Sequence, residues 1–256
     1  TVFTNKILLL ADGIPSTRLM DLGVFEFMNF HMEFLYYANT YLETILVRKP
    51  SKDFLYLIMD KGQRSHRDLL YFLLKDDKEF DNSVCERNTR NNRQVFKDLV
   101  DSYGKALYEL DHNWYDRFPS IKFYSDTNFE IVGETFGELG NDAFFPTEKI
   151  VKPITMKHPF VVAGSKGYLR NLRTLGFKTF ADHIDESYDL IHDWQDRTKA
   201  VVEVVRSIIR KGSLKFYNET KSIREHNYNV LCDMQGRQKN ILWNNMKKVM
   251  EKINEG

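Results

Sequence analysis

The sequence predicts an α/β fold built on a doubly wound parallel sheet. Short apolar runs rich in β-branched or aromatic residues recur along the chain, which is typical of buried strands. Segments with apolar residues at helical spacing follow these runs, and polar or glycine-containing loops join the two. Strands that alternate with helices favour a parallel sheet, whose ligands bind outside the carboxyl ends of its strands.

Composition limits the classes to which the chain can belong. A length of 256 residues permits a substantial core in one large or two small domains. The formal net charge of +1 gives no overall basic field for nucleic acids, and no apolar run approaches the roughly 20 residues that span a bilayer. Cys85 and Cys232 lie far apart without metal-ligand spacing, which fits a reducing compartment. We therefore expect a cytoplasmic protein without a membrane span.

Residues 1–50 predict a small first segment. A buried strand is expected at 6–11 (KILLLA), followed by a turn that contains Pro15. Apolar residues at helical spacing over 16–47 predict one helix or two, and Pro50 is a candidate domain boundary.

The next segment predicts a strand, a basic loop and a helix. Residues 54–59 (FLYLIM) read as a buried strand, and DLLYFLL at 68–74 as a short amphipathic helix. The basic loop between them contains Arg64 and Arg67, which could grip a phosphate together with free N–H groups at the helix start. The alternative is a solvated basic loop with Ser65 as N-cap, and the loop alone favours this alternative.

Weaker signals follow in the middle of the chain. We expect a short strand at 80–86, a helix at 94–110 and a strand fragment at 122–124. The ionisable and aromatic cluster at 112–117 is compatible with substrate contact, although an ordinary loop has the same composition.

The stretch from 129 to 189 carries the strongest pattern. FEIVGET and PFVVAG predict two buried strands, Thr147 is a candidate N-cap, and GSKGYLRNLRTLG predicts a glycine-rich turn and a helix. Residues 183–211 predict one long helix or two that end at Gly212, and 213–256 are polar and helical in parts.

Polar side chains gather where this pattern places the carboxyl ends of the strands. They are Glu134, Glu148, Lys149, Lys152, Ser165 and Lys166. Cations near helix starts suit a pyrophosphate, and carboxylates suit ribose hydroxyls, so this set is compatible with a nucleotide. Fixed positive groups could stabilise a departing diphosphate without a metal, and we expect no metal site. Motifs for a phosphate-binding P-loop, a serine nucleophile elbow, a zinc protease and a full dinucleotide fingerprint are absent from the sequence.

Four segments resemble a known family. FLYLIMDKGQRSHRDLLYFLL, FEIVGETF, FFPTEKIVKPI and PFVVAGSKGYLRNLRTLGFKTFADHIDESYD are similar to glycosyltransferase-like proteins common in large DNA viruses, phages and some bacteria. The TEK segment and the preceding Glu-bearing strand resemble the nucleotide-sugar-binding half of the α1,3-fucosyltransferases. The resemblance covers about Phe54 to Arg210. It implies a Rossmann-like, GT-B-type domain and an inverting transferase that needs no metal to bind its nucleotide.

The resemblance also implies roles for individual residues. Glu134, Lys149 and Arg67 would be catalytic: Glu134 would contact the donor sugar or ribose, and the two cations would stabilise the diphosphate. The donor-binding residues would be Arg64, Glu148, Lys152, Ser165 and Lys166, with Glu148 on the ribose. The matching acidic segment contains Asp185, Glu186 and Asp189, which we interpret mainly as caps of the helix that follows.

The chain departs from the family in its first segment. Only about fifty residues precede Phe54, so we expect a reduced N-terminal acceptor-side segment at 1–50, a nucleotide-sugar domain at 51–212 and a C-terminal helical extension at 213–256. The family's catalytic base usually comes from the acceptor side. Its candidates match no motif: Asp12, Glu26, His31 and Glu33. A Glu-Asn pair of the fucosyltransferases is also missing, because Thr135 follows Glu134.

These inferences give a first choice and two alternatives. We expect a hexosyl- or fucosyltransferase-like enzyme in the cytoplasm, or in the host cytoplasm if the protein is viral. It would use no resident cofactor but a GDP- or UDP-sugar as co-substrate. The acceptor would be a glycan, a protein or a modified base. The alternatives are a non-catalytic nucleotide- or glycan-binding module and an interaction protein that uses its basic C-terminal helix.

Overall fold

A four-stranded parallel sheet forms the centre of the fold in the part of the chain that the structure, a computed structural model, describes. The described residues are 47–58, 64–87, 93–102, 120–138 and 144–234. The strands are β1 (Lys52–Ile58), β2 (Val84–Arg87), β3 (Thr127–Gly133) and β4 (Phe160–Ala163). Their order is β2-β1-β3-β4, and every pairing is parallel.

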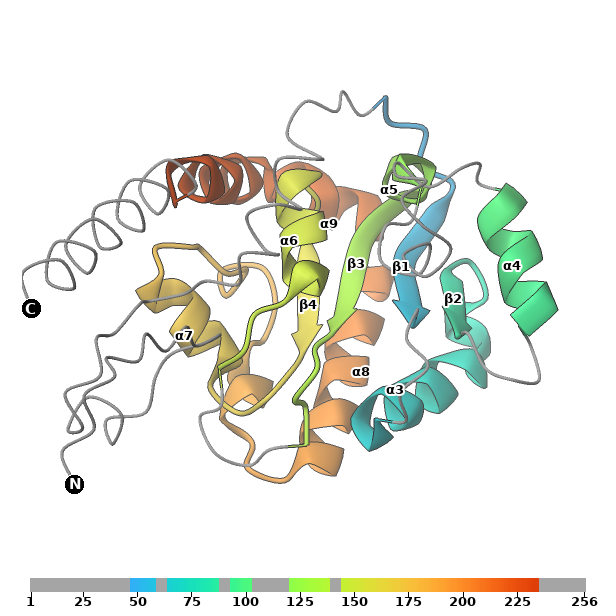
Figure 1. Cartoon of the computed structure of the whole chain (residues 1–256), viewed down its shortest axis with the longest axis horizontal. Coiled ribbons are helices and arrows are strands. Elements are labelled where there is room, and N and C mark those ends of the chain that lie inside the picture. Colours follow the sequence, from blue (N-terminus) through green and yellow to red (C-terminus); the bar gives the residue numbers. More distant parts are fainter. Residues whose placement is uncertain (1–46, 59–63, 88–92, 103–119, 139–143, 235–256) are drawn as a thin grey trace, which may run out of the picture.

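Helices cover both faces of this sheet. They are α3 (Ser65–Lys75), α4 (Arg93–Ser102), α5 (Ile121–Asp126), α6 (Glu148–Thr155), α7 (Tyr168–Thr174), α8 (Trp194–Lys211), α9 (Ser213–Glu219) and a helix at 221–234, with 3-10 turns η1 (Lys78–Phe80) and η2 (Ser187–Leu190). Figure 1 shows α8 and α9 behind the sheet and α6 in front of it. Because α3 packs beside α8 and α5 contacts β1 and β3, the sheet is buried on both faces.

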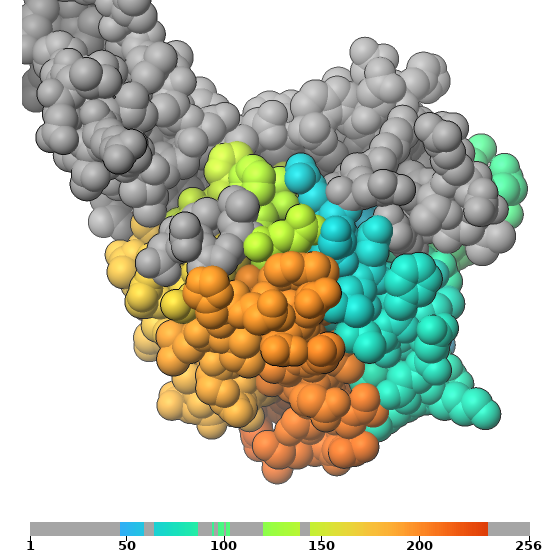
Figure 2. All heavy atoms as spheres, turned by 90° about the horizontal axis from the view of Figure 1, so that it is seen from below, coloured from blue at the N-terminus to red at the C-terminus, as the bar shows by residue number. Residues whose placement is uncertain are grey.

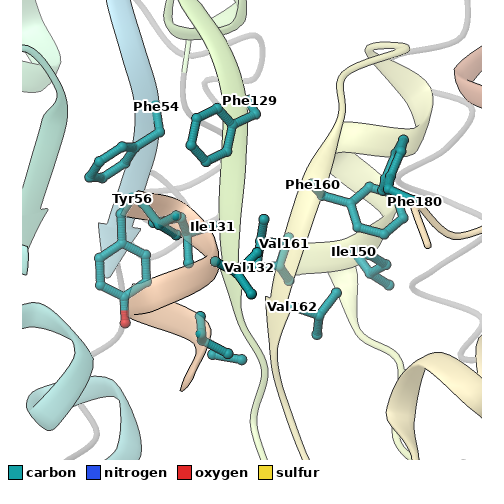
Figure 3. Packing of buried hydrophobic residues seen from close by; sticks show 14 of the residues in the cluster. Phe54, Tyr56, Phe129, Ile131, Val132, Ile150, Phe160, Val161, Val162 and Phe180 are labelled. Carbon is teal, nitrogen blue, oxygen red and sulfur yellow. The ribbon is translucent and has the colours of Figure 1, made fainter. Parts of the chain in front are cut away.

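The strands are apolar because each is packed on both sides. In β1, Phe54 and Tyr56 belong to the larger hydrophobic cluster, whereas Leu55 belongs to a second cluster on the opposite face with residues of α5. Figure 3 shows the larger cluster between neighbouring strands. The rings of Phe54 and Phe129 lie 5.6 Å apart, so aromatic contacts join β1 to β3.

The C-terminal helices pack on this same core. The ring of Phe216 on α9 lies 6.0 Å from Phe129 and 5.6 Å from Phe180. In the helix at 221–234, Leu231 and Met234 also belong to the larger cluster. The described part of the predicted C-terminal extension therefore shares the hydrophobic core of the sheet.

The predicted strands and helices between 54 and 212 are largely confirmed. The structure contains the strands predicted at 54–59 and 129–135 with small shifts in their bounds, whereas the strand predicted at 80–86 begins only at Val84, after the 3-10 turn η1 that ends at Phe80. The segment at 183–211 divides into η2 and α8, and Gly212, at φ 99°, ends α8.

Two local predictions are wrong. The expected strand fragment at 122–124 is part of α5, because the Ser120 side chain accepts a hydrogen bond from the Lys122 N–H and caps a helix there. The N-cap position of α3 is Arg64 rather than Ser65, and no side-chain hydrogen bond caps it from that position.

Several predictions fall outside the described residues. These are the strand at 6–11, most of the helical segment at 16–47, the cluster at 112–117 and the base candidates Asp12, Glu26, His31 and Glu33. None of the helices that are described is long and apolar enough to cross a membrane.

Candidate functional site

The strand order reverses between β1 and β3. The chain leaves β1 to form β2 on one side and later returns to form β3 on the other. In doubly wound sheets, the crevice outside the carboxyl ends of two such strands is the usual ligand site. Figure 2 views this edge end on, with α3 in cyan, the segment after β3 in green and the start of α8 in orange side by side.

Three segments from different parts of the sequence meet at this edge. The guanidinium carbon of Arg64, before α3, lies 5.8 Å from the centre of the Phe136 ring, after β3. The Phe136 ring lies 5.3 Å from that of Phe145, close to the start of α6. Lys149 in the first turn of α6 donates through Nζ to Thr147 Oγ1 at 3.3 Å. The structure thus brings the segments bearing Arg64, Glu134 and Lys149 to one edge of the sheet.

Glu134 is buried and acts as a hub of hydrogen bonds. It is 1% exposed. Its Oε1 accepts from the Thr147 N–H at 3.2 Å and from the Tyr168 hydroxyl at 2.8 Å. Its Oε2 accepts from Thr147 Oγ1 at 2.7 Å and from the Thr135 N–H at 3.3 Å. Both oxygens are thus directed at the protein itself, which joins β3 to the starts of α6 and α7.

Arg67 and His66, at the start of α3, bind the backbone of the same residue. Arg67 Nε donates to the Glu134 carbonyl at 3.1 Å, and His66 Nε2 lies 2.8 Å from that carbonyl oxygen. Both side chains are almost completely buried. Gly137 permits this packing, because a Cβ at that position would lie only 2.1 Å from the His66 ring. The arrangement fixes the loop after β3 against α3.

Glu148 and Lys149 form a partly exposed ion pair at the start of α6. Lys149 Nζ lies 2.6 Å from Glu148 Oε1, and the side chains are 22% and 15% exposed. Burial acts to raise the pKa of Glu148, but the ammonium groups of Lys149 and Lys152 lower it to about 2. Thr147 is the N-cap of α6, as predicted, and its hydroxyl accepts from the Lys149 N–H. This pair holds accessible charges of both signs beside the switch point.

Lys152 lies deeper, beneath the edge. It is 6% exposed and is attracted by Glu130 on β3 and by Glu148. Burial raises the pKa of Glu130 to about 7, although Lys152 and Tyr124 act to lower it. In this structure Lys152 interacts with charges inside the protein, and its contact with a donor stays a prediction.

The glycine-rich turn before α7 offers little to an anion. Asp189 accepts hydrogen bonds from the N–H groups of Leu169 and Arg170, which are the first-turn donors of α7. Ser165 is 3% exposed, whereas Lys166 is partly exposed. A carboxylate of the chain thus occupies the first-turn N–H groups of α7, and the donor contacts of Ser165 and Lys166 stay predictions.

The acidic segment contributes caps, but not all of them to the helix that follows. Asp185 accepts from the Ser187 N–H, whereas the N-cap position of η2 is Glu186, whose side chain forms no capping hydrogen bond. Asp189 caps the earlier helix α7, and Asp193 caps α8 by accepting from the Gln195 and Asp196 N–H groups. Glu186 instead accepts from the Phe180 N–H at 2.7 Å and so holds the loop after α7.

Two further residues at this edge were not identified from the sequence. Arg197 on α8 is 3% exposed and donates to the carbonyls of Gly137, Gly164, Ile191 and His192, which lie in the loops after β3 and β4 and before α8. Glu138 accepts from the His66 N–H at 3.2 Å and caps α3. An arginine at a helix start and a glutamate in a loop are common on surfaces, so neither gave a signal in the sequence.

A pocket of about 290 Å³ lies away from this edge, against β2. Its lining includes Lys52, Lys75, Cys85 and Leu99. Burial raises the pKa of the Cys85 thiol to about 12, so the thiolate is disfavoured at neutral pH. The pocket does not include any of the predicted site residues.

Comparisons of the chain with protein-family models, curated proteins and solved structures find no match. Within the described ranges, no group of three or more His, Cys, Asp or Glu side chains is arranged to hold a metal ion. The case for a function therefore depends on the geometry of the edge and on the residues that line it.

Proposed function

We propose that this chain binds a nucleotide-activated sugar at the carboxyl edge of its sheet and transfers the sugar to an acceptor hydroxyl with inversion. The supporting observation is the meeting of three segments at the point where the strand order reverses: the residues before α3, the loop after β3 and the start of α6. A GDP- or UDP-sugar would be the co-substrate.

The partly exposed charges provide the proposed donor contacts. Lys149 and Arg64 would face the diphosphate, where positive charge stabilises the leaving group. Glu148, with its low pKa, stays ionised at neutral pH and would accept hydrogen bonds from ribose hydroxyls. Lys166 is a further partly exposed cation at the neighbouring strand end.

The buried residues receive a different role in this proposal. Glu134 and Arg67 form hydrogen bonds within the protein, so they would position the loop after β3 and the start of α6. Lys152 would support the charge of Glu148 from below. We therefore treat these residues as positioning residues, although the sequence placed Glu134 and Arg67 in catalysis.

The proposed reaction is a single displacement. The acceptor oxygen, from a glycan, a protein or a modified base, attacks the anomeric carbon and its proton passes to a base. The bond between that carbon and the diphosphate oxygen breaks, and the diphosphate leaves with its electron pair beside Lys149 and Arg64. The candidates for the base lie among residues 1–46, outside the described part of the chain.

One observation favours a second candidate function. Two of the three side chains that the sequence assigned to catalysis, Glu134 and Arg67, are at most 2% exposed. A buried carboxylate that only joins elements suits a non-catalytic nucleotide- or glycan-binding module as well as an enzyme.

Calorimetry with GDP-, UDP- and CMP-sugars tests the proposal. We expect the chain to bind one donor and Lys149→Ala and Glu148→Ala each to weaken binding by about tenfold or more, roughly 1.4 kcal/mol. Both variants should melt close to the parent protein, because the pair is partly exposed. Lys221→Ala is the matched control, since Lys221 forms an exposed pair with Glu225 in the C-terminal helix.

Product analysis separates the two functions. Donor binding followed by transfer or hydrolysis supports the enzyme, and binding alone supports the module. Absence of binding to every donor would contradict the enzyme and a nucleotide-binding module, and would favour an interaction protein unless the chain binds a glycan without a nucleotide.

A further inference from the structure

The start of α3 already holds an anion of its own chain. Glu138 Oε1 lies 3.2 Å from the His66 backbone nitrogen, and the Glu138 side chain is 36% exposed. Burial acts to raise the pKa of Glu138, but hydrogen bonds from His66 and from the Ser65 N–H lower it. An exposed carboxylate on the N–H groups of an 11-residue helix occupies the kind of position where helices bind phosphate.

The His66 ring lies beside this carboxylate, but its Nδ1 atom has no hydrogen-bond partner there. The ring is buried, and Nε2 must carry the proton because the Glu134 carbonyl, 2.8 Å away, can only accept. Burial and the charge of Arg67 lower the pKa of His66, and together they outweigh the Glu134 carbonyl and the Glu138 carboxylate, which act to raise it, so the neutral ring is favoured at neutral pH. Nδ1 is then an acceptor, and it has no hydrogen-bond partner.

The group that Nδ1 faces is another acceptor. Glu138 Oε1 lies 3.5 Å from Nδ1, and an ionised carboxylate has no hydrogen to donate. Leaving a buried acceptor without a hydrogen bond destabilises the protein. A ligand with both an anionic oxygen and a hydroxyl would satisfy both neighbours, because the oxygen accepts from the helix N–H and the hydroxyl donates to Nδ1.

We propose that the start of α3 is a binding site for a phosphate group that is accompanied by a hydroxyl donor, and that Glu138 occupies this site until the ligand displaces it. The inference deepens the proposed function and rests on it for the natural ligand. A nucleotide-sugar supplies phosphate oxygens together with ribose and sugar hydroxyls. Glu138 then acts as an internal competitor, which occupies the helix N–H groups when no ligand is bound.

Inorganic phosphate and sulfate distinguish the two parts of this inference. At neutral pH, phosphate carries both an anionic oxygen and a hydroxyl, whereas sulfate carries only the anionic oxygens. Calorimetry with each anion should be run on the parent chain, on Glu138→Ala and on Glu203→Ala. Glu203 is the matched control, because it is an exposed carboxylate on α8 with a salt bridge to Arg206.

We expect Glu138→Ala to bind phosphate about tenfold more tightly than the parent chain, with a smaller gain for sulfate. Glu203→Ala should bind both anions like the parent. If Glu138→Ala fails to fold, Glu138→Gln should shift phosphate affinity in the same direction, because a neutral amide competes less well for helix N–H groups.

The possible results separate a failure of this inference from a failure of the proposed function. Unchanged, weaker or undetectable phosphate binding in the Glu138 variants contradicts a displaceable carboxylate. An equal gain for sulfate contradicts hydroxyl donation to His66. Tighter phosphate binding without binding of any nucleotide-sugar supports the site and contradicts the proposed transferase, whereas nucleotide-sugar binding with unchanged phosphate affinity contradicts this inference alone.

Discussion

Individual carboxylates at the edge of this sheet perform two different tasks. Glu134 and Asp189 are buried and accept hydrogen bonds that join strands, loops and helix starts. Glu148 and Glu138 are partly exposed, and each contacts a group that a ligand could also use. The sequence shows all four as similar acidic residues in or near loops, so burial is what separates the structural carboxylates from the two that we propose to take part in binding.

Glu130 should make stability depend on pH. Its pKa in the folded protein is about 7, above the ordinary value of 4.5, so the folded state binds more protons than the unfolded state between these values. The contribution of Glu130 to the free energy of unfolding is present in full below pH 4.5 and is lost as the pH rises through about 7. At 1.36 kcal/mol per pKa unit, this contribution is about 3 kcal/mol.

Urea unfolding of the parent chain and of Glu130→Gln across pH 4.5 to 7 checks this prediction. The neighbours that face Glu130 are Lys152 on α6, Tyr124 on α5 and Glu134 after β3, and all are retained in the variant. The free energy of unfolding of the variant should fall less steeply with pH. Glu225→Gln, an exposed change, should follow the parent curve, and identical slopes for all three proteins would contradict the assignment.

At the scale of elements, each helix that starts at this edge is capped by an oxygen of the chain. Glu138 caps α3, Thr147 caps α6, Asp189 caps α7 and Asp193 caps α8. Such caps satisfy the N–H groups that a helix start leaves unpaired. They also occupy the positions that an anionic ligand would need, so a ligand must either displace a cap or bind beside it.

The cap on α6 can be tested by substitution. Thr147→Ala removes a hydroxyl that accepts from the Lys149 N–H and donates to Glu134, so we expect it to lower the free energy of unfolding by about 1–2 kcal/mol. Thr147→Ser keeps the hydroxyl and should lose much less. Chemical denaturation measures both, and equal losses would show that the methyl group, rather than the cap, stabilises the site.

The elements were predictable because each carries a local signal. The apolar runs of β1, β3 and β4 and the Thr147 cap gave correct predictions, since periodicity and capping depend on neighbours in sequence. The prediction for 122–124 was wrong because its two aromatic residues are typical of a strand, whereas the Ser120 cap starts a helix. The role of Glu134 required long-range information, because its partners Thr147 and Tyr168 come from other elements.

At the scale of the whole molecule, the sheet and the C-terminal helices form one core. Phe216 is 6% exposed and contacts rings on β3 and in the loop before η2. The sequence predicts a helical extension at 213–256 that is polar overall and packs across the domain, and a few apolar residues at helical spacing suffice to bury one face of it.

Phe216→Ala tests this shared core. The substitution should lower the free energy of unfolding by about 3–5 kcal/mol, because it removes a buried ring and leaves a cavity. Leu214→Ala, two residues away on the same helix and 49% exposed, should cost far less. Denaturation with a single transition would be expected for both, and a Phe216 variant as stable as the Leu214 variant would show that the helix does not belong to the core.

The most direct test of the account is a crystal structure of the chain with a bound GDP- or UDP-sugar. The account predicts the diphosphate between Lys149 and the start of α3, the ribose beside Glu148, and the Glu138 carboxylate moved away from the His66 N–H. A nucleotide bound in the pocket against β2, or one at this edge that leaves Lys149 and Glu148 paired only with each other, would contradict it.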